Sequence, residues 1–385
     1  MPDADARRHS EALCAHIAAE IAKAGGAIPF ERYMELALYA PGLGYYSAGA
    51  QKFGAAGDFI TAPEAAPVFG RVIARQCAEI LDAAGGDTLL ELGAGSGTLA
   101  AGILNEFARL DRAPPRYLIL EPSPDLQARQ RERLKESLPA EAFARVEWLD
   151  RLPRAFAGVI VANEVLDALP VARFEATADG VREMGVAVEG DAFAWRLMPP
   201  RAALADAVSR LEAARDAPFA PGYQSEINLN LAAFVHGLGD CITRGALLFV
   251  DYGMPQHTFY LPERDTGTLM CHYRHRAHAD PFLYPGLQDI TAHVDFTAVA
   301  EAGVAAGLEL AGYTSQAYFL LGGGLEAIMR ESDPAETRAH LELTRQIKLL
   351  TSPEEMGERF KVMMLARGLD TIPSGFALRD QAHLL

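Results

Sequence analysis

Three observations predict an α/β fold built on a Rossmann-like parallel sheet. Short apolar segments alternate with segments of helical periodicity, which is the pattern of β-α units. Several of the apolar segments, such as residues 157–162, carry no polar side chain, as expected for strands buried on both faces of a parallel sheet. The first predicted strand, residues 88–92, runs directly into a glycine-rich loop, as strands that end at a ligand site commonly do.

Composition narrows the class of protein. The chain has 385 residues, half of them apolar and 22% charged, which is typical of a globular enzyme. No apolar run approaches the roughly 18 to 20 residues that span a bilayer, so we expect a soluble protein without a membrane partner. A net charge of −16 argues against nucleic acid as a partner. Scattered cysteines and a polar N-terminus favour a cytoplasmic location.

The first 80 residues are expected to form a helical cap and an active-site loop. Leu13, Ile17 and Ile21 recur at four-residue spacing and predict a helix over residues 7–24, with a second helix after Pro29. Residues 40–67 are rich in glycine, proline and aromatic residues, which predicts a long functional loop. A further helix is expected over residues 68–81.

Residues 81–385 are expected to form the main domain. Between its fourth and fifth strands, residues 173–240 form an insertion, in which 173–198 predict two or three antiparallel strands followed by an alanine-rich helix. The sequence predicts main-sheet strands at 88–92, 117–121, 146–149, 157–162, 246–251, near 308–313 and at 360–364, with a helix at about 296–306.

The glycine-rich loop contains Gly93, Gly95 and Gly97, where we expect positive φ angles or close approach to a ligand. A dinucleotide-binding loop of the G-x-G-x-x-G kind would have its third glycine at position 98, but that residue is Thr98. The observed spacing, with Glu91 two residues upstream, resembles motif I of class I S-adenosylmethionine methyltransferases. Glu91 could hold the ammonium group of a ligand, whereas it would repel a pyrophosphate.

Acidic residues follow the other strands of the predicted sheet. Glu121 lies 28 residues after Gly93 and could accept both hydroxyl protons of a ribose; the alternative is a surface helix cap before Pro122. Asp150 could accept a hydrogen bond from an adenine amino group, or it could be an ordinary turn residue. The acidic strand ends support a nucleoside ligand.

Polar residues at the end of the fourth strand are candidates for the acceptor site. Asn163, Glu164 and Asp167 lie where an acceptor would approach the cofactor. A guanidinium acceptor is always charged and needs carboxylates to orient it, a role that Glu164 and Asp167 could fill with help from Glu226. The alternative for Glu164 and Asp167 is the N-terminal turn of a helix.

Histidines gather over residues 271–278, with His293 nearby. The spacing lacks a second cysteine and does not fit a zinc site, so we expect no metal. A polar loop that closes over a substrate is the preferred interpretation.

Taken together, these residues resemble the MidA-like family, relatives of the mitochondrial complex I assembly factor that is a protein arginine methyltransferase. The matching stretches are residues 33–39, 42–46, 57–64, the glycine-rich loop, 162–171, 251–253 and 289–296. The resemblance implies a seven-stranded class I methyltransferase fold with a helical N-terminal cap, S-adenosylmethionine as cofactor and an arginine of a protein as acceptor. It adds Asp58 and Thr61 as cofactor contacts and Glu64, His293 and Asp295 as substrate contacts. The chain departs from the family pattern at Val165-Leu166, where aromatic residues are expected.

The sequence therefore predicts a methyltransferase that modifies an arginine of a partner protein, of the respiratory complex I subunit type. The alternatives are a small-molecule methyltransferase and a cofactor-binding assembly protein without turnover. An NAD-dependent oxidoreductase is a third, less favoured alternative. The oligomeric state is left open, with a homodimer as one option.

Overall fold

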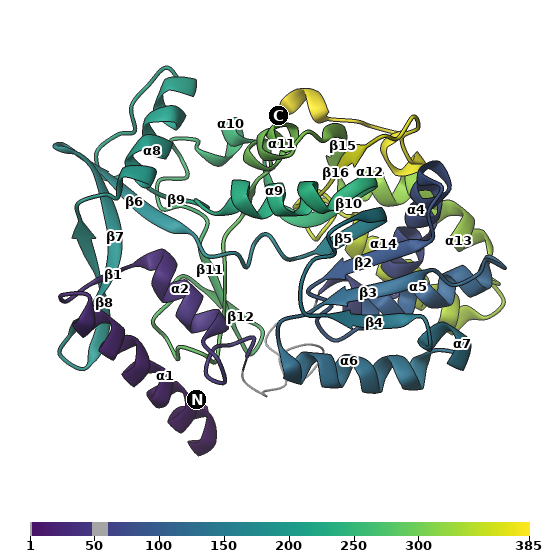
Figure 1. Cartoon of the computed structure of the whole chain (residues 1–385), viewed down its shortest axis with the longest axis horizontal. Helices are drawn as coiled ribbons and strands as arrows, with labels where there is room; N and C mark the ends of the chain where they lie inside the picture. The colour runs from purple at the N-terminus through teal and green to yellow at the C-terminus, as the bar shows by residue number, and fades with distance from the viewer. Residues whose placement is uncertain (1, 48–60) are drawn as a thin grey trace.

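The computed structural model describes residues 2–47 and 61–385, and it contains a large mixed sheet flanked by helices (Figure 1). Five neighbouring strands are parallel, and β16 is antiparallel to both of its neighbours, β10 and β15. In spatial order the strands are β15 (Glu309–Ser315), β16 (Phe360–Arg367), β10 (Ile242–Met254), β5 (Phe156–Asn163), β2 (Thr88–Leu92), β3 (Arg116–Leu120) and β4 (Val146–Leu149); the short β14 (Val294–Asp295) pairs with β10. The expected Rossmann-like, seven-stranded sheet is confirmed.

Two hydrophobic clusters cover the two faces of this sheet, because successive side chains of a strand point to opposite faces. Leu89 on β2 belongs to the cluster that contains α4 (Val68–Ala84) and α5 (Thr98–Arg109). Its neighbour Leu90 belongs to the cluster that contains α9 (Leu231–Cys241) and α11 (Phe296–Ala305). The other helices around this sheet are α3 (Ala62–Ala65), α6 (Pro124–Ser137), α7 (Ala140–Phe143), α12 (Gln316–Leu320), a π-helix at Leu321–Leu325, α13 (Glu326–Arg330), α14 (Thr337–Thr351) and two short 3-10 helices at Ser374–Phe376 and Ala382–Leu384.

A second lobe lies beside the main sheet (Figure 1). Its antiparallel sheet is formed by the insertion and by β1 from the N-terminal segment. The elements of this lobe are α1 (Ala4–Lys23), β1 (Ile28–Pro29), α2 (Phe30–Tyr39), β6 (Ala172–Thr177), β7 (Gly180–Glu189), β8 (Ala192–Met198), α8 (Ala202–Ala214), β9 (Gln224–Ile227), α10 (Gln256–Phe259) and a small sheet of β11 (Met270–Tyr273), β12 (Arg276–His278) and β13 (Asp289–Thr291). The insertion therefore shares a sheet with the N-terminal segment.

The first 80 residues divide between the two lobes. Helices α1 and α2 share a core with β7 and β13, in which Leu13, Phe30, Val186 and Ile290 are buried together. Helix α4, in contrast, packs on the main sheet. The predicted helix of 68–81 belongs to the sheet domain because its apolar face is buried there.

The histidine-rich segment is not the polar loop that the sequence predicts. It forms the antiparallel hairpin β11–β12, turning at Arg274 and His275, which both have positive φ angles. Cys271 in β11 is fully buried against the N-terminal helices. The described residues contain no group of three or more histidine, cysteine or acidic side chains that could hold a metal ion. Likewise, none of the described helices is long and apolar enough to cross a bilayer.

Candidate active site

A cavity of about 690 Å³ lies at the carboxyl ends of β2, β3, β4 and β5. This volume is within the range of small-molecule sites in proteins. Polar and aromatic residues from both lobes line it, together with glycines of the glycine-rich loop. They include Tyr39, Tyr46, Thr61, Glu91, Gly93, Gly95, Thr98, Glu121, Gln127, Asp150, Asn163, Glu164, Asp167 and Asp289. The structure thus brings together most of the cofactor and acceptor residues expected from the sequence.

The glycine-rich loop has the backbone that its sequence predicts. Gly93, Gly95 and Gly97 have φ angles of 60°, 54° and 81°, which residues other than glycine adopt only at a cost in conformational energy. The N–H of Gly93 donates to the carbonyl of Leu120 at 3.0 Å, which ties the loop to β3. Gly97 precedes α5, so the loop leads into a helix N-terminus at the cavity.

Glu91 ends its strand inside the protein. The side chain is buried, and Oε2 accepts a hydrogen bond from the Tyr117 hydroxyl at 2.7 Å. Burial raises the pKa of Glu91 to about 7, and the nearby charge of Glu121 acts in the same direction. A ligand with an ammonium group would favour the ionised form of Glu91.

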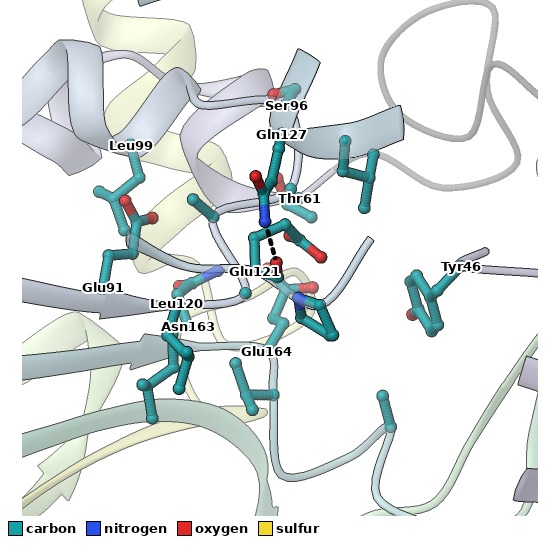
Figure 2. A pocket seen from close by; sticks show the side chains of 18 of the residues that line it. Tyr46, Thr61, Glu91, Ser96, Leu99, Leu120, Glu121, Gln127, Asn163 and Glu164 are labelled. Carbon is teal, nitrogen blue, oxygen red and sulfur yellow. Dashed lines mark hydrogen bonds between the residues drawn. The ribbon is translucent and has the colours of Figure 1, made fainter. Parts of the chain in front are cut away.

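Glu121 is buried and lies within the cavity wall, so it is not the surface cap that we considered. Its Oε1 accepts the N–H of Ser123 at 3.0 Å, and its Oε2 accepts from Gln130 Nε2 at 3.1 Å. Ser123 itself is the N-cap of α6. Figure 2 shows Glu121 projecting into the cavity below Gln127, whose side chain donates to the Glu121 carbonyl at 2.7 Å. These contacts fix the carboxylate at the position expected for a ribose site.

The other expected cofactor residues lie around the same cavity. Asp150 follows β4 and lines the cavity, as does Thr61, the N-cap residue of α3. Thr98 begins α5, and its hydroxyl accepts a hydrogen bond from Arg133 at 2.8 Å. Asp58 lies outside the described residues.

Glu164 follows β5 with a φ of 54°, an unusual backbone conformation for a residue other than glycine. No helix begins at this point, so the helix N-terminus considered from the sequence is wrong. Its N–H donates to the Val250 carbonyl at 2.9 Å, and its Oε1 accepts from Asn163 Nδ2 at 3.1 Å. Burial raises the pKa of Glu164 to about 8, with further increases from the charges of Asp167 and Asp289.

Asp167 is 4% exposed, and burial raises its pKa to about 6. The segment that carries it is fixed by Asp251, the last acidic strand end, whose Oδ2 accepts from the N–H groups of Val165, Leu166 and Asp167 at 3.2, 2.9 and 3.3 Å. Asp251 therefore holds the backbone of residues 164–168, called the acceptor segment below, in place.

The second lobe contributes the opposite side of the cavity. The rings of Tyr39 and Tyr46 stack with centroids 5.5 Å apart. The Tyr39 hydroxyl donates to the carbonyl of Ala168 at 2.8 Å, and the Tyr46 hydroxyl donates to Asp289 Oδ1 at 3.0 Å. The N-terminal segment thus contacts both the acceptor segment and β13.

Comparisons with known proteins agree with this geometry. Residues 72–314 match the model of a family described as S-adenosyl-L-methionine-dependent methyltransferases. The chain belongs to this family. Two relatives are named protein arginine methyltransferase NDUFAF7, mitochondrial: the Danio rerio protein is 30% identical over 91% of this chain and 86% of its own length, and the Homo sapiens protein is 30% identical over 89% and 81%. A crystal structure of a Burkholderia thailandensis protein bound to S-adenosyl-homocysteine is 48% identical, with a TM-score of 0.95 over 100% of this chain and 99% of that one.

The cofactor of this methyltransferase is S-adenosylmethionine, as the sequence predicts. The residues that line the cavity fit this cofactor: Glu91 would hold its ammonium group, Glu121 its ribose hydroxyls and Asp150 its base, beside the glycines of the loop. When bound, the cofactor supplies a methyl group on a positively charged sulfur. The acidic lining of the cavity suits that charge.

Three expected substrate residues of the methyltransferase lie elsewhere. Glu226, His293 and Asp295 line a separate cavity of about 50 Å³, on the other side of the acceptor segment at Leu166. Glu226 Oε1 accepts a hydrogen bond from the N–H of Thr268. Its Oε2 lies 3.8 Å from Nε of Arg173, so Glu226 is part of a buried ion pair. Asp295 is the N-cap of α11, and the N–H of His293 donates to the Thr268 hydroxyl. The structure therefore places these three residues outside the main cavity. Glu64, on α3, is half-buried and is not among the residues that line the main cavity.

Sequence reasoning missed the contributions of Tyr39, Tyr46 and Asp289. All three lie in stretches that carry the family resemblance, so the signal was present. Their role depends on the packing of the N-terminal segment against β13, which brings residues 243 positions apart into a hydrogen bond.

Proposed function

We propose that this methyltransferase transfers methyl groups to the guanidinium of an arginine in a partner protein. One observation carries the proposal: within the described residues, Oε2 of Glu164 and Oδ1 of Asp167 are buried at the cavity and have no hydrogen-bond partner. A buried carboxyl oxygen without a partner is costly to the folded protein. A cationic donor from a substrate would supply what these two oxygens lack.

A guanidinium fits this requirement because it stays charged and presents several N–H donors in one plane. The raised pKa of Glu164, about 8, reflects a site that disfavours an isolated negative charge. A bound guanidinium would reverse that effect and stabilise the carboxylate. Asn163 Nδ2 and the Val250 carbonyl hold Glu164 in place, so the carboxylate can orient the reacting nitrogen.

The names of the relatives support a protein acceptor. Those of zebrafish and human are protein arginine methyltransferases, and this chain aligns with more than four-fifths of each. A subunit of respiratory complex I as the partner is the finer part of our proposal and comes from the family resemblance alone. The cytoplasmic location expected from the sequence also stays a proposal.

The test is a transfer assay with S-adenosylmethionine labelled in the methyl group. Purified enzyme is incubated with a lysate, and the products are separated by size and examined by mass spectrometry for methylarginine. We expect label in protein, on arginine. Label found exclusively in small molecules would contradict the arginine proposal and favour a small-molecule methyltransferase. Glu147→Gln, a change in an exposed pair with Arg116, is a control that should retain transfer.

A further inference from the structure

The side of the cavity that faces the strand ends is formed by the second lobe. Tyr46 comes from the segment after α2 and Asp289 from the start of β13, and both line the cavity that also contains Glu164. Figure 2 shows Tyr46 standing apart from the strand-end residues, across the cavity from Asn163 and Glu164. The acceptor site therefore has two walls that come from two lobes.

Asp289 is held in a defined orientation on this wall. It is 6% exposed, and its Oδ1 accepts two hydrogen bonds, from the Tyr46 hydroxyl and from the N–H of Ile290, both at 3.0 Å. Strand β13 is itself fixed by pairing with β11, where Asp289 lies opposite His272. A carboxylate fixed from two directions is preorganised for a ligand.

The charge of Asp289 acts across the cavity. It contributes to the raised pKa of Glu164 on the opposite wall and to the raised pKa values of Tyr39 and Tyr46 on its own wall. Negative groups that face one cavity from two sides repel each other, and a cation between them relieves the repulsion. The tyrosine rings add an aromatic surface, on which a flat guanidinium stacks well.

Resting on the proposed function, we infer that Asp289, oriented by Tyr46, is a specificity-determining residue that selects a guanidinium over a lysine ammonium. The N–H donors of a guanidinium are spread over a plane and can reach carboxylates on two walls. An ammonium group concentrates its three donors at one point. Asp289 would bind the edge of the guanidinium turned away from Glu164 and leave the reacting nitrogen to Glu164 and Asp167.

The experiment measures transfer to paired peptides that differ only in an arginine or a lysine. For Asp289→Asn we expect kcat/KM on the arginine peptide to fall roughly 10- to 100-fold, mainly through KM, because one charge-assisted contact is lost. The preference for arginine over lysine should shrink with it, while affinity for S-adenosylhomocysteine stays within about twofold of wild type. Tyr46→Phe keeps the ring and loses the hydrogen bond, so it should show a smaller rise in KM.

Two control variants match these changes in chemistry. Asp280→Asn alters an aspartate that also accepts a backbone N–H, that of Phe282 at 2.9 Å, in a loop that does not line the cavity. Tyr33→Phe removes a hydroxyl that donates to the Pro281 carbonyl in the core of the second lobe. Both should keep the wild-type KM and the wild-type preference for arginine.

The possible results separate the two ideas. A wild-type enzyme that methylates arginine, with an Asp289→Asn variant of unchanged KM and unchanged preference, overturns the inference and leaves the proposed function standing. A wild-type enzyme that methylates no arginine overturns the proposed function, and the inference with it. If Asp289→Asn fails to fold, as judged by circular dichroism, the Tyr46→Phe variant decides, and a KM equal to wild type counts against the inference.

Discussion

The carboxylate of Asp251 accepts the backbone N–H of Asp167 at 3.3 Å, and thereby joins β10 to the acceptor segment. The same oxygen accepts the N–H groups of Val165 and Leu166, and the other oxygen accepts that of Tyr252. The Asp251 side chain is 1% exposed, so both of its oxygens make these hydrogen bonds inside the protein. Asp251 thus holds three consecutive N–H groups of the acceptor segment, alongside the contacts of Glu164 with Val250 and of Ala168 with Tyr39.

Replacing Asp251 by alanine should therefore destabilise the protein and displace the acceptor segment. Several buried N–H groups would lose their acceptor, and we expect the free energy of unfolding to fall by about 2–4 kcal/mol. Urea denaturation followed by circular dichroism measures this loss. Asp251→Asn retains one acceptor oxygen and should lose less. An alanine variant as stable as wild type would show that the segment is held by other contacts.

The Glu164→Gln variant separates an enzyme from an assembly protein that merely binds the cofactor. The glutamine has nearly the same size but no charge, so transfer should fall roughly 100-fold or more while S-adenosylhomocysteine affinity changes by less than about threefold. Initial rates and calorimetric titration give the two values, with Glu147→Gln as control. If partner maturation in cells proceeds normally with the inactive variant, the assembly role is favoured.

Activity should rise with pH through the titration of Glu164. The ionised carboxylate is the form that orients a guanidinium, and burial raises the pKa of this residue to about 8. Below that pH the protonated form predominates, so kcat/KM for the acceptor should decline as pH falls and level off above about 8. The acceptor guanidinium stays protonated throughout and contributes no titration.

A pH profile of kcat/KM on the arginine peptide provides the measurement. Asp289→Asn should move the inflection to lower pH, because one of the negative charges that raise the pKa of Glu164 is removed. A rate that is flat between pH 6 and 9 would contradict the assignment of Glu164 as the orienting carboxylate.

The main sheet could be predicted because its signals are local. The apolar strand of residues 157–162 and the glycines after β2 each specify backbone geometry within a few residues, and the structure has them where expected. The second lobe could not be predicted in the same way. Its sheet pairs β1 with β7, where Ile28 lies opposite Val186. No local sequence pattern predicts a pairing between strands so far apart in the sequence.

The same distinction applies to the site. Glu91, Glu121 and Glu164 lie together at the cavity, as the sequence predicts, because parallel strands place their carboxyl ends at one edge of the sheet. Asp289 lines the main cavity, whereas His293, only four residues later, lines the smaller one, and local sequence patterns do not distinguish the two positions. The course of β13 and the turn that follows determine which of them faces the cofactor side, and that course depends on packing against α2.

The glycine-rich loop allows a prediction with a matched control. Gly93 has a φ of 60°, and a Cβ there would lie 3.4 Å from Val165 Cγ2, in the cavity wall. Gly190, in the turn between β7 and β8, has a nearly equal φ of 62°, and a Cβ there would meet nothing within 4 Å.

Substitution of either glycine by alanine should lower the free energy of unfolding by a similar amount, about 1–2 kcal/mol, because alanine is strained in the left-handed backbone conformation. Only Gly93→Ala should also weaken S-adenosylhomocysteine binding, by roughly tenfold, because Gly93 lines the cavity and the added methyl group would take up space there. Thermal denaturation and calorimetric titration of both variants test this, and equal affinities would show that the loop needs glycine at position 93 for its turn alone.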